Sequence, residues 1–193
     1  MKLQIDPNDF PRFLARGNVK ECYVGDKWPD RVLKVSPVGK SRLTPLEIDY
    51  FERLERRGIT ADFLPKYYGW FENEHWVGYV QEFIRGETIT TLTDYLRAHI
   101  AEPDVLRDLD ARLSKLYEEI LASGVLVLNI HTENILVDTA MMRFWGIDGF
   151  GTPEKFPLPY WFDFCRRRKQ KKHWEKFKRR YRNRVAELTA EAV

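Results

Sequence analysis

The sequence has few of the features that mark membrane-spanning, secreted or disulfide-stabilised proteins. No apolar run approaches the roughly 18 residues of a transmembrane helix, and the start of the chain has no signal-peptide core. The two cysteines, Cys22 and Cys165, lie far apart, which argues against a disulfide framework or a cysteine metal cluster. We therefore expect a protein of the reducing, cytoplasmic compartment.

Apolar residues, by contrast, are plentiful. Hydrophobic residues make up 44% and aromatic residues 14% of the 193 residues, which is typical of globular chains and not of disordered ones. The length is enough for one sizeable core or for two small lobes that share one. We therefore expect a single folded domain over residues 1–193.

Positive charge is concentrated near the C-terminus. Residues 166–184 contain 12 lysine and arginine residues and one acid, Glu175, so this segment carries +11 and the rest of a chain of net charge +3 carries −8. Such a segment can bind anionic lipid, lipopolysaccharide phosphates or nucleic acid. The alternative, which we favour, is the solvated face of a helix that docks through four aromatic residues: Trp161, Phe164, Trp174 and Phe177. Nothing indicates sequence-specific DNA binding.

The chain is organised around one polar stretch between apolar runs. Residues 125–128 and 135–137 are apolar and flank residues 129–134, and Asp148 comes later, just before a Gly-Phe-Gly turn. This pattern predicts a β-hairpin that presents Asn134 and Asp148 at the ends of buried strands. An amide oxygen and a carboxylate held close together suit a hard cation such as Mg²⁺. We therefore expect Asn134 and Asp148 to bind a metal ion.

The spacing is that of the kinase catalytic and metal-binding loops, D-x-x-x-x-N followed by D-F-G. The metal positions are intact, and the second motif reads Asp148-Gly149-Phe150. The position of the catalytic base is occupied by Asn129, whose amide cannot accept a proton as a carboxylate does. His131 stands where kinases often have a lysine that touches the γ-phosphate. It is either a cation or base near neutral pH, or an ordinary polar loop residue.

A lysine lies inside an apolar strand in the first half of the chain. Lys34 interrupts the strand expected over residues 31–36, and a buried lysine is costly unless it is paired. Either it belongs to an edge strand and reaches water, or it is the kinase lysine that holds nucleotide phosphates and pairs with an acid on the next helix. That helix is expected from Thr44, as N-cap, to Gly58, and it contains Glu47. We expect Lys34 and Glu47 to pair.

Two further places would contact a nucleotide in a kinase. Gly17 lies in the turn of a strand–turn–strand segment over residues 14–24, where kinases cover the phosphates with a glycine-rich loop. Only one glycine of that pattern remains, and a plain hairpin is the favoured alternative. A later strand ends near Glu82 and Ile84, where the kinase backbone binds adenine; the alternative is an ordinary strand end.

Three more helices are expected. A leucine stripe predicts a long helix over residues 104–123, and a shorter helix begins after Thr91 or Thr93 as cap. The C-terminal segment is expected to be helical over residues 160–191, with a break near Lys169.

Short segments spread along the chain match one family in the same order. They are Gly17, 20–23, 31–35, 47–51, 65–69, 78–80, 88–93, 133–136, 148–151, 157–161, 165–169 and Trp174. On these segments the chain resembles the bacterial YrbL proteins of the PhoP regulatory network, which are related to protein kinases and lipopolysaccharide-core kinases. The resemblance covers roughly residues 14–182.

The resemblance implies an α+β, reduced protein-kinase-like fold. An N-lobe antiparallel sheet with one helix would occupy about residues 1–84, and a small helical C-lobe with the catalytic and metal-loop hairpin residues 85–159. A basic C-terminal helical segment would follow over residues 160–193. In such a fold Lys34 would hold the phosphates of ATP, Glu47 would orient Lys34, and Mg²⁺ would be the metal. The resemblance implies no established substrate.

Three functions remain open. One is a nucleotide-binding enzyme with weak or unusual phosphotransferase activity toward an unknown protein or glycolipid phosphoacceptor, and another is a regulatory pseudokinase. The third binds no nucleotide and uses the basic C-terminal helix to bind an anionic partner or membrane surface. The set Lys34, Glu47, Asn134 and Asp148 favours the first two. Asn129, which the resemblance implies is shared by the family, favours the pseudokinase over the enzyme.

Overall fold

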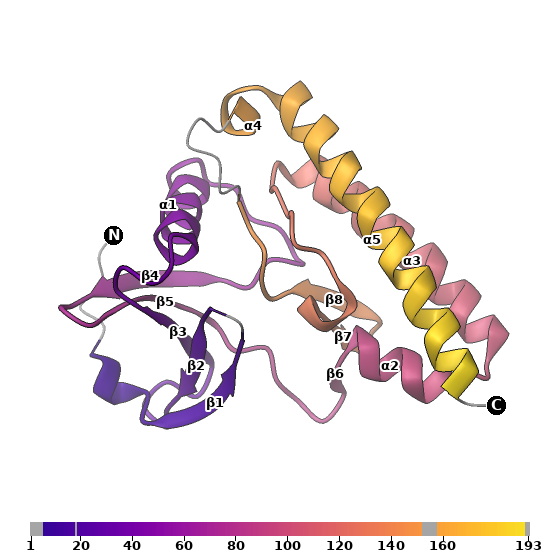
Figure 1. Cartoon of the computed structure of the whole chain (residues 1–193), viewed down its shortest axis with the longest axis horizontal. Helices are drawn as coiled ribbons and strands as arrows, with labels where there is room; N and C mark the ends of the chain where they lie inside the picture. The colour runs from indigo at the N-terminus through magenta and orange to yellow at the C-terminus, as the bar shows by residue number, and fades with distance from the viewer. Residues whose placement is uncertain (1–5, 18, 152–157, 192–193) are drawn as a thin grey trace. The chain divides into compact units, whose positions relative to one another are not determined.

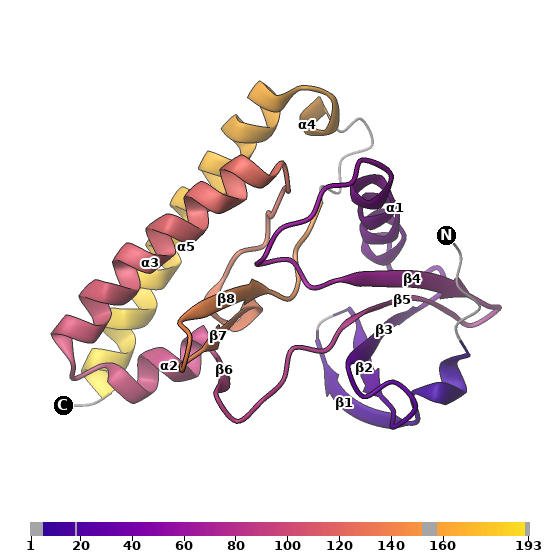
Figure 2. The ribbon, with the colours of Figure 1, turned by 180° about the vertical axis from the view of Figure 1, so that it is seen from behind.

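The computed structural model describes residues 6–17, 19–151 and 158–191. Within them the chain forms two compact units, which are described separately. Of the described residues, unit 1 comprises 6–17, 19–58, 65–85 and 151, and unit 2 comprises 59–64, 86–150 and 158–191. Figures 1 and 2 show the helices and strands of both units from opposite sides.

Unit 1 is built on an antiparallel sheet of five strands, as the sequence predicts for the N-terminal part. Their spatial order is β1–β2–β3–β5–β4. The strands are β1 (Arg12–Arg16), β2 (Glu21–Val24), β3 (Arg31–Pro37), β5 (Trp76–Glu82) and β4 (Tyr67–Glu72). A short 3-10 helix, η1 (Pro7–Asp9), precedes them.

Alternation along β3 and β5 gives this sheet two different faces. Leu33, Val35 and Val80 are buried in one hydrophobic cluster. Lys34 and Tyr79 lie directly opposite each other in the two strands. Because successive side chains in a strand point to opposite faces, Lys34 and Tyr79 project from the face that does not hold this cluster.

Helix α1 (Leu43–Arg56) lies beside β4 and β5 within unit 1 (Figure 1). Its buried residues include Phe51, as the helical spacing predicts. Thr44, however, does not cap the helix. It lies in the first turn, fully buried, and its Oγ1 accepts a hydrogen bond of 2.8 Å from the Ser36 hydroxyl. The hydroxyl is thus engaged by the sheet, and Arg42 occupies the N-cap position without a side-chain hydrogen bond.

Unit 2 contains a three-stranded antiparallel sheet and its helices. The strands, in spatial order, are β6 (Ile89–Thr91), β7 (Ile135–Asp138) and β8 (Arg143–Gly146). The helices are α2 (Leu92–His99), α3 (Pro103–Ser123), the 3-10 helix η2 (Thr132–Asn134), α4 (Leu158–Trp161) and α5 (Asp163–Glu191). Strands β7 and β8 form the predicted hairpin.

Local signals in unit 2 behave largely as predicted. Thr91 caps α2, since its side chain accepts a hydrogen bond from the backbone N–H of Asp94. The long helix α3 ends where the chain turns at Gly124, whose φ is +82°. Residues 125–128 are the exception. The apolar pattern predicts a strand there, but only an isolated bridge between Val127 and Phe150 forms.

The basic helix α5 lies along α3 in both views (Figures 1 and 2). Its inner face buries Trp174 and Phe177, as predicted, and the Trp174 ring stacks on Tyr117 with centroids 4.8 Å apart. The helix continues through Lys169 without the predicted break. The interruption falls instead at Phe162, between α4 and α5.

Two of the aromatic residues expected to dock this helix do not. Trp161 is 66% and Phe164 73% exposed. The reason is helical periodicity. The buried stripe runs from Trp174 back through Gln170 to Arg166. Phe164 is two residues from Arg166, which is about 200° round the helix, so it lies on the opposite side. No helix among the described residues is long and apolar enough to cross a membrane.

Candidate nucleotide and metal site

A buried charged cluster lies on the α1 side of the sheet in unit 1. The Nζ of Lys20 lies 2.6 Å from Oε2 of Glu47 and 3.3 Å from the Tyr79 hydroxyl. The Tyr79 hydroxyl in turn donates to Glu47 at 3.2 Å. Lys20 and Glu47 are only 8% and 9% exposed, so this pair is largely shielded from water and poorly screened by salt.

Lys34 shares this face of the sheet. It is 8% exposed, and it lies opposite Tyr79 in the β3–β5 ladder. The edge-strand alternative is therefore wrong, because β3 lies between β2 and β5. That Lys34 pairs with Glu47 stays a prediction. Lys20 was not expected at this site. A signal was available, because Cys22 lies opposite Lys34 across β2 and β3. Residues two apart in an extended chain share a face, so Lys20 lies on the same face as both.

Gly17 forms a tight turn beside an open groove. Its N–H donates to the carbonyl of Lys20 at 2.8 Å. A Cβ at Gly17 would meet only that carbonyl, at 3.7 Å, so the position does not require glycine sterically. The groove measures about 900 Å³ and is lined by residues from the β1–β2 turn, the end of β3 and the β4–β5 turn, including Gly17 and Lys20. Its size is that of a small-molecule site.

The expected adenine-binding segment follows the last pairings of β5. The N–H of Glu82 donates to the carbonyl of Lys66 at 2.8 Å, and the Glu82 carboxylate accepts from the N–H of Lys66 at 3.1 Å. Ile84 lies two residues beyond the strand and is half-buried. Neither residue lines the groove beside Gly17.

In unit 2, hydrogen bonds of side chains and backbone link the segments that carry Asn129, Asn134 and Asp148. The Asn134 Nδ2 donates to the Asn129 carbonyl at 3.2 Å. The N–H of Ile147 donates to the Asn134 carbonyl at 2.9 Å, which fixes the residue before Asp148. Asp148 Oδ1 accepts from the N–H of Gly149 at 2.8 Å. The polar stretch and the Asp-Gly-Phe turn therefore form one hydrogen-bonded assembly.

Gly149 is where these two segments make their closest approach. Its carbonyl accepts from the N–H groups of Leu128 at 2.8 Å and Asn129 at 3.4 Å. Its φ is +83°, and a Cβ at this position would lie 2.6 Å from the Asn129 Cβ. Glycine is thus required here both by the backbone conformation and by the space available.

The donor atoms of this assembly fit Mg²⁺ in kind. Asn134 and Asp148 both line a cavity of about 20 Å³ in unit 2, which is large enough for about one water molecule. Since the Nδ2 of Asn134 is engaged by the Asn129 carbonyl, its Oδ1 is directed away from that bond. One carboxylate and one amide oxygen are few for a metal held by protein alone, but Mg²⁺ usually retains waters and takes phosphate oxygens. Among the described residues, no group of three or more His, Cys, Asp or Glu side chains could hold a metal ion.

His131 precedes η2 in the same assembly. Burial lowers the pKa of His131 below its usual 6.5, Arg180 acts in the same direction, and Glu133 and Asp148 oppose the shift. The imidazole is therefore neutral at neutral pH, which suits a proton acceptor better than a cation. Its Nδ1 lies 4.0 Å from the Glu133 carboxylate.

Helix α5 holds the polypeptide that leads into Asn129. Gln170 is fully buried, and its amide forms two bonds to the backbone of Val127: Oε1 accepts from the N–H and Nε2 donates to the carbonyl, both at 2.9 Å. One turn later, the Nδ1 of His173 lies 2.6 Å from the Leu128 carbonyl. These two supporting residues were missed by sequence analysis. The one available signal is a neutral glutamine at the centre of a strongly basic segment.

Comparison with solved structures defines the class of fold. The structure is similar to Rad53 1–466 in complex with AMP-PNP, with a TM-score of 0.54 and 17% sequence identity, over 73% of this chain and 38% of that chain. It is also similar to the BubR1 kinase domain, with a TM-score of 0.50 and 14% identity, over 71% of this chain and 44% of that chain. The chain thus has a protein-kinase-like fold, as predicted, and spans less than half the length of either kinase chain.

Sequence comparison then identifies the family. The family model for PhoP regulatory network protein YrbL matches residues 9–182. The YrbL proteins of Escherichia coli (strain K12) and Shigella flexneri are each 25% identical to this chain in an alignment 175 residues long. The alignment covers 85% of this chain and 82% of theirs. The chain belongs to the YrbL family, which confirms the resemblance seen in the sequence.

Proposed function

We propose that this chain binds ATP and Mg²⁺ and acts as a regulatory pseudokinase or a weak, atypical phosphotransferase. The observation that carries the proposal is the assembly of Asn134 and Asp148 around one cavity, with the Asn134 amide oriented by the Asn129 carbonyl. An amide oxygen and a carboxylate that line one cavity have the chemistry of a site for a metal ion shared with phosphate.

The buried lysines of unit 1 independently support phosphate binding. Lys34 and Lys20 are each 8% exposed on the face that carries Glu47. Burying such charges costs free energy, so the presence of two buried lysines on one face of the sheet favours a role beyond folding. The similarity to Rad53, which was solved with AMP-PNP, adds fold-level support.

When bound, ATP would supply the phosphoryl group and Mg²⁺ would offset its charge. The γ-phosphoryl P–O bond would break and a new bond to an acceptor hydroxyl would form, and the hydroxyl proton would need an acceptor. Asn129 cannot take it, and loss of a general base typically costs about 10²–10⁴-fold in rate. His131, neutral because burial lowers its pKa, is the proton acceptor we propose. The molecule that receives the phosphoryl group would be an unknown protein or glycolipid.

Thermal unfolding with ATP, with and without Mg²⁺, tests nucleotide binding. A ligand at 100 times its Kd stabilises the native state by about 2.7 kcal/mol, which raises Tm by about 5–11 °C for a chain of this length. The proposal requires a rise that depends on Mg²⁺ and is lost in Asp148→Asn. Glu133→Gln, which changes an exposed carboxylate in the same assembly, is the matched control and should retain the rise.

Two lysine variants test whether Lys34 or Lys20 binds the phosphates of ATP. Lys34→Met and Lys20→Met each remove one buried cation, and the shift produced by ATP is compared with each variant's own Tm. Loss of the shift in Lys34→Met alone supports the kinase assignment of Lys34. Absence of any shift in the wild type at millimolar ATP would rule out nucleotide binding, and with it both the enzyme and the nucleotide-binding pseudokinase.

A further inference from the structure

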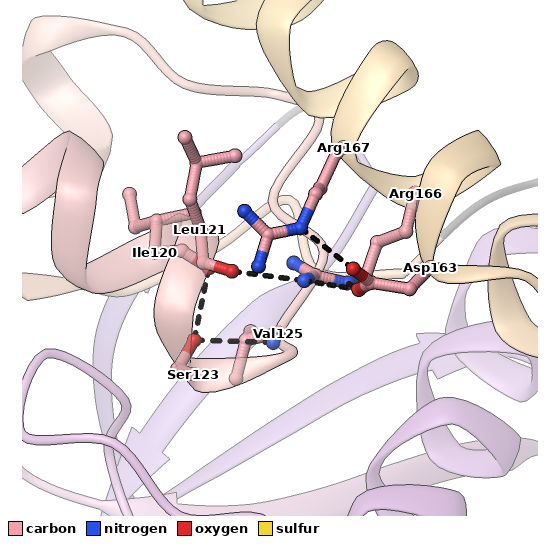
Figure 3. A network of polar contacts seen from close by, with 7 residues as sticks. All are labelled: Ile120, Leu121, Ser123, Val125, Asp163, Arg166 and Arg167. Atoms are coloured by element: carbon pink, nitrogen blue, oxygen red, sulfur yellow. Dashed lines mark hydrogen bonds and ion pairs between the residues drawn. The ribbon is translucent and has the colours of Figure 1, made fainter.

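The beginning of α5 is fixed to the end of α3. The Nη2 of Arg166 donates to the Leu121 carbonyl at 2.8 Å, and its Nε donates to Asp163 Oδ1 at 2.9 Å (Figure 3). Arg167 binds the other oxygen of the same carboxylate at 2.6 Å. Arg166 is only 6% exposed. Since Arg166 is buried here and Gln170 is buried one turn later, the rotation of α5 is set, and so is the face that it turns to solvent.

That solvent face is cationic along most of its length. Eight lysine and arginine residues of α5 are exposed: Arg167, Arg168, Lys171, Lys172, Lys176, Arg179, Arg180 and Arg182. The acid within this stretch, Glu175, pairs with Lys178 at 2.8 Å. From residue 167 to residue 182 the helix extends about 22 Å. The docking that we favoured from the sequence therefore leaves a row of cations facing water.

Large apolar side chains are exposed at the start of this row. Leu158 is 55%, Trp161 66%, Phe162 58% and Phe164 73% exposed. Singly scattered apolar residues on a surface are ordinary, but these four lie within seven consecutive positions, and we call them the apolar patch. Phe164 is followed by Arg168 and Lys171 at helical spacings of four and seven, so these three lie on the same side of α5.

We propose that α4 and the exposed face of α5 bind the surface of an anionic phospholipid membrane. The apolar side chains of the patch would lie at the boundary between headgroups and acyl chains, where tryptophan and phenylalanine are favoured. The cations would lie over the headgroup phosphates, because clusters of lysine and arginine are attracted to anionic lipid. Duplex nucleic acid would account for the cations but not for the aliphatic and aromatic patch. This proposal does not depend on nucleotide binding.

Sedimentation of the full chain with lipid vesicles provides the test. Vesicles of phosphatidylcholine with about one third phosphatidylglycerol are compared with vesicles of phosphatidylcholine alone, at low salt and at 1 M NaCl, where charge attraction is screened over about 3 Å. Binding is expected to the anionic vesicles at low salt, with a large loss at high salt. No binding to anionic vesicles at low salt overturns the proposal.

Two variants separate the contribution of charge to vesicle binding from that of apolar contact. Arg168→Gln, Lys171→Gln and Lys172→Gln together should weaken binding roughly 100-fold. The control with the same charge change, Arg97→Gln, Arg107→Gln and Lys115→Gln on α2 and α3, should weaken it much less.

The apolar variant decides the identity of the partner. Trp161→Ser, Phe162→Ser and Phe164→Ser together should weaken vesicle binding at least about 10-fold, because membrane affinity scales with buried apolar area. Its control changes two exposed apolar residues elsewhere, Phe13→Ser and Met141→Ser, which are 58% and 77% exposed. All of these positions are exposed, so the fold should tolerate the changes, which an unchanged Tm verifies. The membrane proposal is overturned if the apolar variant binds vesicles as tightly as the wild type. It is also overturned if the wild type and the apolar variant bind duplex DNA equally tightly and neither binds vesicles.

Discussion

Gln170→Leu is expected to detach α5 from the polypeptide that leads into Asn129. The side chain is fully buried and binds both the N–H and the carbonyl of Val127 at 2.9 Å. Leucine has a similar volume and forms neither bond. The substitution therefore leaves two backbone groups without partners in a site that water does not reach.

The cost follows from those two groups. An unsatisfied buried donor or acceptor costs about 1–3 kcal/mol, so the pair costs about 2–6 kcal/mol, less a smaller gain from the apolar leucine. At about 2–4 °C per kcal/mol for a chain of this size, Tm should fall by at least about 4 °C. Gln170→Glu should cost at least as much, because it buries a carboxylate and turns one of its oxygens toward the Val127 carbonyl, which is itself an acceptor.

Thermal unfolding and amide hydrogen exchange measure this effect. Exchange of the Val127 amide should accelerate in Gln170→Leu, while the Leu128 amide, which donates to the Gly149 carbonyl at 2.8 Å, should keep more of its protection. Asn183→Leu, at an exposed position on the same helix, is the control and should change stability by less than about 0.5 kcal/mol. Unchanged protection of Val127 together with an unchanged Tm would refute the coupling between α5 and this segment.

Three further substitutions test other parts of the structure. Gly149→Ala should cost about 2–4 kcal/mol in unfolding free energy, since a φ of +83° and a 2.6 Å approach both oppose a Cβ, whereas Gly58→Ala, with a φ of +62° and open space, should cost about 1 kcal/mol. Arg166→Met should lower stability by about 1–3 kcal/mol, because it leaves a backbone carbonyl without its hydrogen bond. Arg167→Met, whose ion pair is exposed, should lower it by less than about 0.5 kcal/mol. Denaturant titration measures the glycine variants and the arginine variants alike. Burial lowers the pKa of His173 below 6.5 against the opposing hydrogen bond, so the unfolded chain binds the proton more tightly. Stability should therefore fall as pH drops below about 6.5, less steeply in His173→Gln, as unfolding between pH 7.5 and 5 would show; equal slopes would contradict this assignment.

Several features could be predicted because they depend on neighbours in the sequence. The leucine stripe of α3, the Thr91 cap and the β7–β8 hairpin each follow from patterns within a few residues. The segments around Asn134 and Asp148 belong to that same hairpin region, which is why spacing alone placed them correctly near each other. The burial of Lys34 was also foreseeable, since apolar residues flank it on both sides.

The supporting contacts were missed because they join residues far apart in the chain. Lys20 reaches Glu47 across 27 positions, and Gln170 and His173 reach Val127 and Leu128 across 43 and 45. Which strand lies beside which, and in what register, decides these contacts. A pattern of residue types does not contain that information unless the partner elements are already placed.

The sequence by itself determined where the helices and most strands form, that charge is divided between an acidic body and a basic C-terminal segment, and that the catalytic-base position holds Asn129. It could do so because helix and strand periodicity, turn residues and motif spacing are local properties of the chain. The tertiary structure alone decided that Lys20 bonds to Glu47 in unit 1, and which stripe of α5 is buried within unit 2. Burial of Arg166 and Gln170 turned Phe164 and the cations outward, because a helix can bury only the face whose polar groups find partners in the surface beneath it.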